Sequence, residues 1–121
     1  MLKTIEIDGK KVRFESKGST VLRYKLQFHR DFLADIMKMK DLMSAGNNPS
    51  YEQIKTLDME VFYNICWTLA KTADKNIPEP IDWLDEFEEF PIMDIMSELQ
   101  ELITKSFGTT KKKSRKNQKV K

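Results

Sequence analysis

The chain has 121 residues, enough for one ordinary domain whose core needs neither disulfides nor a metal ion. Hydrophobic residues make up 40% and charged residues 33%, which excludes a disordered or fibrous class and is typical of a globular protein. The single cysteine, Cys66, excludes an internal disulfide, and its apolar neighbours predict a small buried side chain. No stretch approaches the ~18 apolar residues of a membrane span and no apolar leader opens the chain, so we expect a soluble intracellular protein.

The formal net charge of +2 hides a division between two parts of the chain. Residues 111–121 carry seven of the 21 basic residues and no acid, which leaves 14 basic against 19 acidic residues, or −5, for residues 1–110. The folded part is therefore mildly acidic, and the basic character comes from the tail. A nucleic-acid-binding protein would more often carry positive charge on a structured face.

A β-hairpin is predicted at the start. Residues 3–7 and 11–15 each alternate apolar and polar side chains, and Asp8-Gly9 lies between them. Both turn residues tolerate the positive φ of a tight turn, which makes this the strongest short hairpin signal. An isolated hairpin is only marginally stable, so we expect it to pack against helices or another chain.

One long helix is predicted next, from an N-cap at Ser19 or Thr20 to the breaker cluster at 44–49. Its apolar face repeats every three or four residues: Val21, Tyr24, Phe28, Phe32, Ile36, Met39 and Met43. A second row consists of Leu22, Leu26, Leu33 and Met37. So wide a stripe predicts burial on more than one side, within the domain or against a partner.

Three further helical segments follow. A capping box at 50–53 starts a second helix that runs to about Ala73, and a proline-rich break ends it at 76–80. A short helix is expected at 82–90, and Pro91 opens a last helix with an apolar face that reaches about Phe107. We therefore predict a mainly α fold with a small N-terminal hairpin: a compact domain of about four helices over residues 1–108, followed by a disordered lysine-rich tail at 109–121.

The sequence offers little for catalysis. The only histidine, His29, lacks the further ligands of a metal site and a nucleophile beside it, so we interpret it as a surface or partner-contact residue. Nine acidic residues occur between Ile77 and Thr104 without a Lys or Arg among them. Their spacing does not match a calcium loop, and a solvated acidic face is the simplest interpretation. We expect no catalytic residue, no metal ion and no cofactor.

Several apolar residues are instead candidates for binding a partner, because aromatic side chains and adaptable methionines are favoured at interfaces. These candidates are Phe28, Phe32, Met39, Met43, Trp83, Phe87 and Phe90. The charged residues of segment 9–40 are mostly basic, and those of the segment after Ile77 are acidic, so copies could stack head to tail. Pairing of the two parts within one molecule is an equal alternative.

The order of these features resembles the tail assembly chaperones of long-tailed bacteriophages, particularly those that infect low-GC Gram-positive hosts. The likeness spans nearly the whole chain and depends on order and spacing more than on any one motif. After the hairpin, it rests on segments 22–25 (LRYK), 28–32 (FHRDF), 70–74 (AKTAD), 77–78 (IP) and 81–87 (IDWLDEF), and on the Thr/Lys-rich end. The segment 88–91 (EEFP) has no clear counterpart in the family.

The resemblance implies a mechanism. Such proteins form homo-oligomers that coat the long helical tape measure protein in the host cytoplasm, and they are absent from the mature virion. Many are also made in a longer form through a ribosomal frameshift, and the added part recruits the tail tube protein. The lysine codons of Lys111, Lys112 and Lys113 would then be a plausible shift site.

Two other classes remain open from the sequence. A small helical nucleic-acid-binding or regulatory protein could use the basic tail, with affinity that falls steeply with salt. An enzyme with a carboxylate site near 82–89 would gain stability from a divalent ion. The acidic balance of residues 1–110 makes nucleic-acid binding the weaker of the interaction hypotheses, and no membrane partner is expected.

Overall fold

The predicted hairpin is confirmed. In the computed structural model, which describes residues 1–39 and 59–107, strands β1 (Leu2–Ile7) and β2 (Lys10–Glu15) pair antiparallel. Ile7 lies opposite Lys10, so the loop consists of Asp8 and Gly9 alone. Their φ values of 53° and 77° are both positive, as a two-residue turn that matches the strand twist requires.

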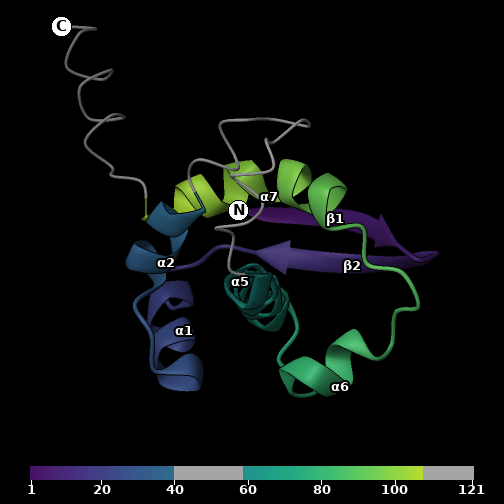
Figure 1. Cartoon of the computed structure of the whole chain (residues 1–121), viewed down its shortest axis with the longest axis horizontal. Coiled ribbons are helices and arrows are strands. Elements are labelled where there is room, and N and C mark those ends of the chain that lie inside the picture. Colours follow the sequence, from purple (N-terminus) through teal and green to yellow (C-terminus); the bar gives the residue numbers. More distant parts are fainter. Residues whose placement is uncertain (40–58, 108–121) are drawn as a thin grey trace, which may run out of the picture.

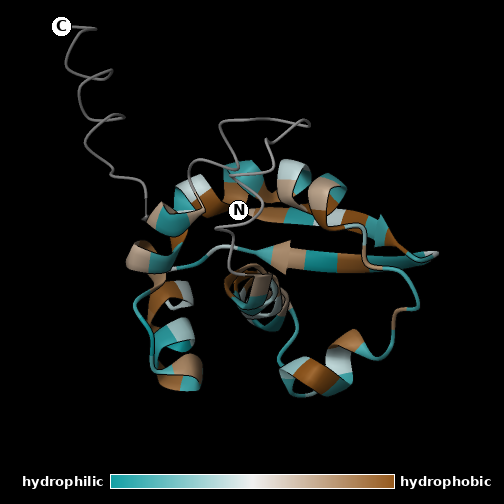
Figure 2. Ribbon diagram, in the orientation of Figure 1, coloured by the Kyte–Doolittle hydropathy of each residue, from teal (hydrophilic) through white to brown (hydrophobic). Residues whose placement is uncertain are grey.

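The hairpin buries one face against two helices. Ile7 and Phe14 are fully buried, and Ile5 and Val12 beside them are partly buried, while most of the alternate residues are exposed. Hydrophobic and hydrophilic residues alternate along β2 (Figure 2). Helix α5 (Met59–Ala73) packs mainly on β2, and α7 (Ile92–Phe107) packs on β1 (Figure 1). The strands and these two helices therefore form the centre of the fold.

Helix α5 is the most buried element, because its sequence is apolar almost all round. Cys66 is fully buried in it, as expected, and burial raises the pKa of its thiol. Two buried threonines satisfy their hydroxyls within the helix: Thr68 donates to the Asn64 carbonyl at 2.8 Å, and Thr72 donates to the Thr68 carbonyl at 2.7 Å. Both hydroxyls are therefore satisfied inside the helix.

The prediction of one long first helix is wrong over the described residues. The segment forms α1 (Thr20–Phe28) and α2 (Phe32–Lys38), which are separated by a sharp corner. His29 ends α1 in the left-handed conformation with φ 58°, and the Asp31 side chain caps α2 by accepting the Ala34 amide at 3.1 Å. Apolar spacing continues across the corner because each helix buries its own row, so periodicity alone could not reveal the break.

The short helix also differs from its prediction. Helix α6 (Pro80–Leu84) begins and ends earlier than the expected 82–90, with Pro80 at its first position. The loop that follows brings Phe87 and Phe90 against Trp83. Helix α7 starts one residue after Pro91, whose carbonyl accepts the Ile95 amide at 3.0 Å.

A mainly α fold with a small N-terminal hairpin is therefore confirmed, with five helices among the described residues. None of the helices in the described part combines the length and apolar character that crossing a membrane requires. The predicted capping box at 50–53, Met43, Lys111–Lys113 and the predicted tail at 109–121 lie outside the described residues.

Candidate functional site

The most unusual surface feature is a row of exposed apolar side chains on α1 and α2. Leu22 and Leu26 are 59% and 67% exposed, and Leu33 and Met37 are 46% and 55% exposed. Each pair has i,i+4 spacing, so its two members lie one turn apart on the same face of a helix. We call these four residues the α1–α2 row.

The exposure of this row follows from the opposite faces of the two helices. Thr20 and Tyr24 of α1, and Phe32 and Ile36 of α2, turn inward and are buried. Single exposed leucines are ordinary on a protein surface, but two exposed i,i+4 pairs on consecutive helices are a candidate interaction site. The sequence shows the row, but it does not show that the row faces solvent.

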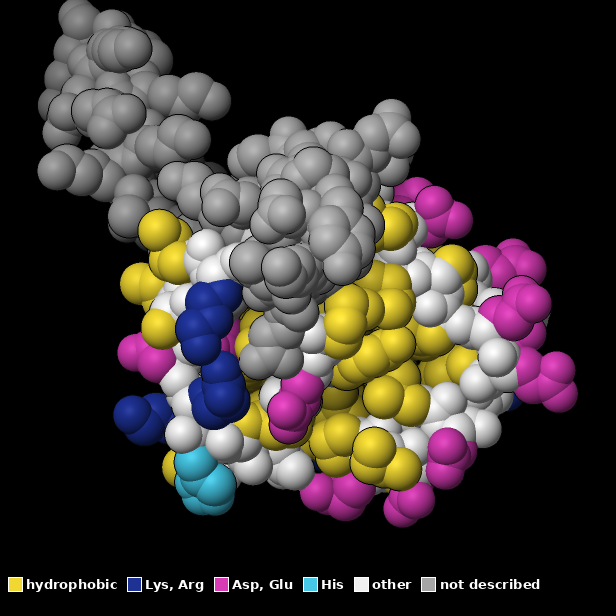
Figure 3. All heavy atoms as spheres, viewed as in Figure 1, with side chains coloured by type: hydrophobic (Ala, Val, Ile, Leu, Met, Phe, Trp, Pro, Cys, Tyr) yellow, Lys and Arg dark blue, Asp and Glu magenta, His cyan; other side chains and the backbone are white. Residues whose placement is uncertain are grey.

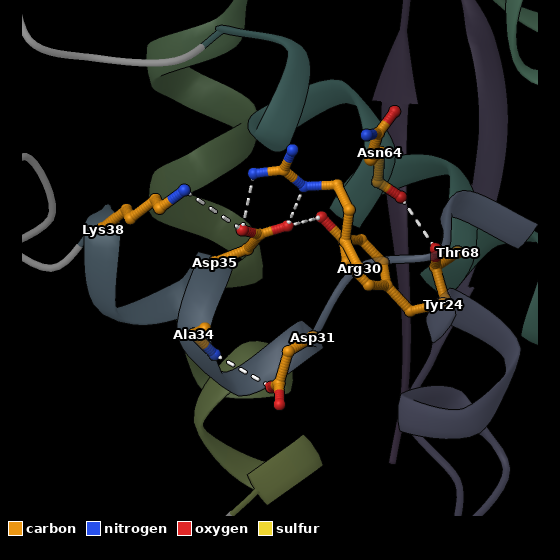
Figure 4. A network of polar contacts seen from close by, with 8 residues as sticks. All are labelled: Tyr24, Arg30, Asp31, Ala34, Asp35, Lys38, Asn64 and Thr68. Atoms are coloured by element: carbon orange, nitrogen blue, oxygen red, sulfur yellow. Dashed lines mark hydrogen bonds and ion pairs between the residues drawn. The ribbon is translucent and has the colours of Figure 1, made fainter. Parts of the chain in front are cut away.

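A buried polar network fixes the corner between α1 and α2 (Figure 4). Asp35 is only 2% exposed, and its Oδ2 accepts hydrogen bonds from Tyr24 Oη at 2.6 Å and Arg30 Nε at 2.7 Å. Its Oδ1 accepts a further bond from Arg30 Nη2 at 2.9 Å, and Lys38 Nζ lies 3.8 Å from the same oxygen. One carboxylate therefore joins α1, the corner and α2.

The network sets the charge state of its members. Burial raises the pKa of Asp35, but the hydrogen bonds from Arg30 and Tyr24 lower it by more, so the pKa lies below its ordinary value. Burial and the hydrogen bond to Asp35 together raise the pKa of Tyr24 well above its ordinary value. At neutral pH Asp35 is therefore ionised and Tyr24 is neutral, which is the pairing that these bonds require.

A cleft of about 340 Å³ opens beside the α1 half of the row, and we call it the α1 cleft. Its lining comes from α1, α5 and the start of α6: Ser19, Leu22, Arg23, Leu26, Gln27, Trp67, Lys71 and Glu79. Gln27 Nε2 donates to Glu79 Oε1 at 2.9 Å, which ties α1 to the start of α6. The cleft thus combines an apolar rim with polar groups in its walls.

The two cations of the cleft differ in their surroundings. Lys71 Nζ donates to the Ile77 carbonyl at 2.7 Å and lies 5.7 Å from the centre of the Trp67 ring. Arg23 Nε is buried and has no hydrogen-bond partner within the described structure. No carboxylate of the described residues lies within ion-pair distance of the Arg23 guanidinium. The cleft therefore holds a cation that could accept an outside carboxylate.

Helix α6 presents a different surface beside this cleft. Ile81 is 70% exposed, the highest value among the large apolar side chains that the structure describes. Asp82 and Asp85 are exposed on the same short element, and neither forms an ion pair with another described residue. Figure 3 shows Asp and Glu side chains gathered along the right and lower rim of the molecule, with Lys and Arg side chains on the left.

Some charges of the basic and acidic parts meet within the molecule. Lys3 Nζ lies 3.1 Å from Glu98 Oε1, which pairs β1 with α7. Lys10 Nζ donates to the Glu86 carbonyl and lies 5.3 Å from the centre of the Phe87 ring. The hairpin tip therefore rests on the loop between α6 and α7, mostly through backbone and ring contacts and not through ion pairs.

The structure separates the seven residues expected to bind a partner. Phe32, Met39, Trp83 and Phe87 are buried in the core, so they cannot contact a partner directly in this conformation. Trp83, for example, packs edge-on against Phe14, with ring centres 6.5 Å apart. Phe28 and Phe90 are partly buried at the edge of the core, and Met43 lies outside the described residues.

The remaining candidates for chemistry are dispersed. His29 is exposed at the corner after α1, in agreement with the prediction of a surface histidine. Across the described residues, no group of three or more His, Cys, Asp or Glu side chains is arranged to hold a metal ion. The α1–α2 row and the adjoining α1 cleft are therefore the best-defined candidate site among the described residues.

No protein-family model, no curated protein and no solved structure matches the chain.

Proposed function

We propose that this protein is a tail assembly chaperone of a long-tailed bacteriophage, which oligomerises and coats the tape measure protein while the tail is built. The observation that carries the proposal is the α1–α2 row, which exposes four large apolar side chains on two helices that the Asp35 network holds at a corner. The order of sequence features that resembles this chaperone family adds to it.

The row suits a helical partner. An amphipathic helix places its own apolar residues at i, i+3 and i+4 spacing, which is the spacing that each half of the row presents. Met37 adds an unbranched, polarizable side chain that adapts to irregular apolar surfaces. A long helical protein could therefore be contacted at many similar positions without a strict sequence requirement.

Low affinity at each site is sufficient for such a function. Many copies bound to one long partner, and to one another, add through avidity, because each bound copy raises the effective concentration of the next.

The described buried polar groups serve the fold: Asp35 ties the corner, and Thr68 and Thr72 bond within α5. The proposal accordingly assigns no enzymatic step to this chain.

The proposal extends to a longer form. A frameshift at the codons for Lys111–Lys113 would add a segment that recruits the tail tube protein, and the chaperone would act in the host cytoplasm and be absent from the finished virion. These residues lie outside the described structure, so the codons themselves provide the test.

The central claim is tested by co-expression with the tape measure protein of the same phage. We expect the wild type to keep that protein soluble and to co-purify with it. The double variant Leu33→Glu, Met37→Glu should lower binding at least ~10-fold, because charges then replace apolar contacts at an interface.

A matched control is available on the hairpin. Leu2 is 52% exposed, similar to Leu33 and Met37, but lies on β1 away from the row. Leu2→Glu should leave binding unchanged. Equal losses in both variants, or no binding by the wild type, would contradict the proposed function.

A further inference from the structure

The α1 cleft and the exposed part of α6 lie side by side and have opposite character. Glu79 lines the cleft and is held to Gln27 at 2.9 Å, and Ile81 follows two residues later. The charged residues that line the cleft are two cations, Arg23 and Lys71, and one carboxylate, Glu79, so its net charge is +1. The adjoining segment of α6 carries the exposed Ile81, followed by two exposed carboxylates, Asp82 and Asp85.

We propose that the α1 cleft receives Ile81 of a second copy of this chain, and that two copies exchange this contact about a two-fold axis. In the dimer, Asp85 of one copy faces Arg23 of the other. Ile81 enters the apolar rim formed by Leu22 and Leu26.

The charges favour a second copy as the occupant. Arg23 lines the cleft and has no carboxylate at ion-pair distance within the described residues. Asp85 lies one helical turn from Ile81, so an apolar side chain and a carboxylate project together from α6. An apolar knob with a carboxylate beside it is the complement of an apolar rim with a cation beside it.

The placement of the two surfaces favours a closed pair. A surface and its complement that lie next to each other can be matched twice by one two-fold rotation, because each copy then offers both. Heterologous stacking would use each surface with a different neighbour and continue into a ring or filament. Three of the most exposed apolar side chains, Leu22, Leu26 and Ile81, would be covered in each copy by a single contact.

The role of this dimer as the unit that coats a partner rests on the proposed function, but the contact itself does not need that partner. It leaves Leu33 and Met37 uncovered for the tape measure protein, since neither lines the cleft. The same complementarity makes the dimer sensitive to salt, because exposed opposite charges are screened.

The test is sedimentation velocity of the purified full chain over a range of protein concentrations, without any partner. We expect a monomer–dimer equilibrium that Ile81→Lys shifts toward monomer at least ~10-fold, since the new cation would face Arg23 and Lys71. The matched control is Leu33→Lys, an equally drastic change at an exposed site outside the cleft, which should leave the equilibrium unchanged. Both sites are exposed, so both variants should fold, and their melting curves check this.

A charge exchange tests the orientation. Asp85→Arg and Arg23→Glu should each weaken the dimer, and the double variant should restore it at least in part. A wild type that stays monomeric, or equal effects of Ile81→Lys and Leu33→Lys, would overturn the proposal. Larger rings or filaments would overturn the two-fold arrangement, and a double variant no better than the singles would overturn the pairing of Asp85 with Arg23.

The outcomes separate this inference from the proposed function. Loss of the dimer with retained tape measure binding would remove the inference alone. A dimer that behaves as expected but does not bind the tape measure protein would remove the function and leave the contact.

Discussion

The buried carboxylate of Asp35 allows a sharp test of how the α1–α2 corner is held. Asp35→Asn keeps the size and shape of the side chain but removes its charge. Three donors converge on the two carboxylate oxygens: Tyr24 Oη at 2.6 Å, Arg30 Nε at 2.7 Å and Arg30 Nη2 at 2.9 Å. An amide has one oxygen, so at least one of these donors must face an NH₂ group.

The cost can be estimated from these bonds. Hydrogen bonds to a charged group contribute about 1.5–3 kcal/mol each, and a donor left without an acceptor adds a penalty of about 1–3 kcal/mol. The Arg30 side chain is 36% exposed, so water can replace part of what it loses. We therefore expect Asp35→Asn to lower the free energy of unfolding by about 3 kcal/mol, a large part of the ~5–15 kcal/mol that a domain has.

Urea unfolding followed by circular dichroism at neutral pH measures this change. Asp31→Asn on the same helix is the matched control: Asp31 caps α2 from an exposed position, and Asn caps as well as Asp. Its expected effect is a few tenths of a kcal/mol at most.

The pH dependence gives a second, independent check. The folded-state pKa of Asp35 lies below its ordinary value of 3.8, so its stabilising contribution is fully present above pH 3.8 and is lost as the pH falls through the folded pKa. The wild type should therefore lose its advantage over Asp35→Asn in that acidic range and keep it at neutral pH. Two results would refute the account of the corner. One is a loss of unfolding free energy under ~1 kcal/mol at neutral pH, and the other is a difference in unfolding free energy between wild type and Asp35→Asn that does not change in acid.

Further predictions concern the turn, the corner, the aromatic core and the codons. Gly9→Ala should cost about 1 kcal/mol in thermal unfolding, because Gly9 has φ 77° and a Cβ there meets no other atom within 4 Å, so backbone strain is the only penalty. His29→Val should destabilise by at least ~1 kcal/mol while His29→Asn should be nearly neutral, since asparagine tolerates the left-handed conformation at φ 58° and valine does not; equal effects would contradict this. Trp83→Ala should cost about 3–5 kcal/mol in urea unfolding, because the ring is 2% exposed and packs on Phe14 and Phe87; a loss under ~1 kcal/mol would mean that the site collapses freely. When the natural gene is expressed with an N-terminal tag, a protein blot should show a minor longer product, and silent recoding of the Lys111–Lys113 codons should abolish it. A single band before recoding would remove the frameshift claim.

The hairpin could be predicted closely from the sequence, because its determinants are local. Asp8 and Gly9 accept positive φ, and the alternation on either side decides which face is buried. The last helix is similarly predictable, since Pro91 marks its start and Leu99, Leu102 and Ile103 keep a regular spacing into the core.

The corner after α1 could not be predicted from apolar spacing, because the same pattern fits one long helix or two short ones. The signals lay in polar residues: Asp31 is a good N-cap, and the Arg30 guanidinium needs the carboxylate of Asp35, which it reaches at the corner. Such a pairing depends on the position of Tyr24 on another helix, which periodicity does not report.

The candidate site was only half visible in the sequence. The sequence predicts aromatic residues as partner contacts, but Phe32, Trp83 and Phe87 are buried, because large apolar side chains contribute most to a core. The sequence shows that the row containing Leu22 and Leu26 is apolar, yet a wide stripe is equally consistent with burial and with exposure. Only the position of the helix on the domain decides between them.

The packing of β1 on α7 has a consequence for the order of events during synthesis. Ser16 Oγ and Ser106 Oγ lie 2.8 Å apart although the two residues are 90 positions apart in the sequence. The hairpin therefore reaches its final environment only after α7 has been made. A two-stranded hairpin is marginal by itself, and translation proceeds at ~5–20 residues per second. Ile7 on β1 would therefore wait roughly 5–20 s for the helix that packs on its strand, and its apolar side chain lacks that cover for the whole period.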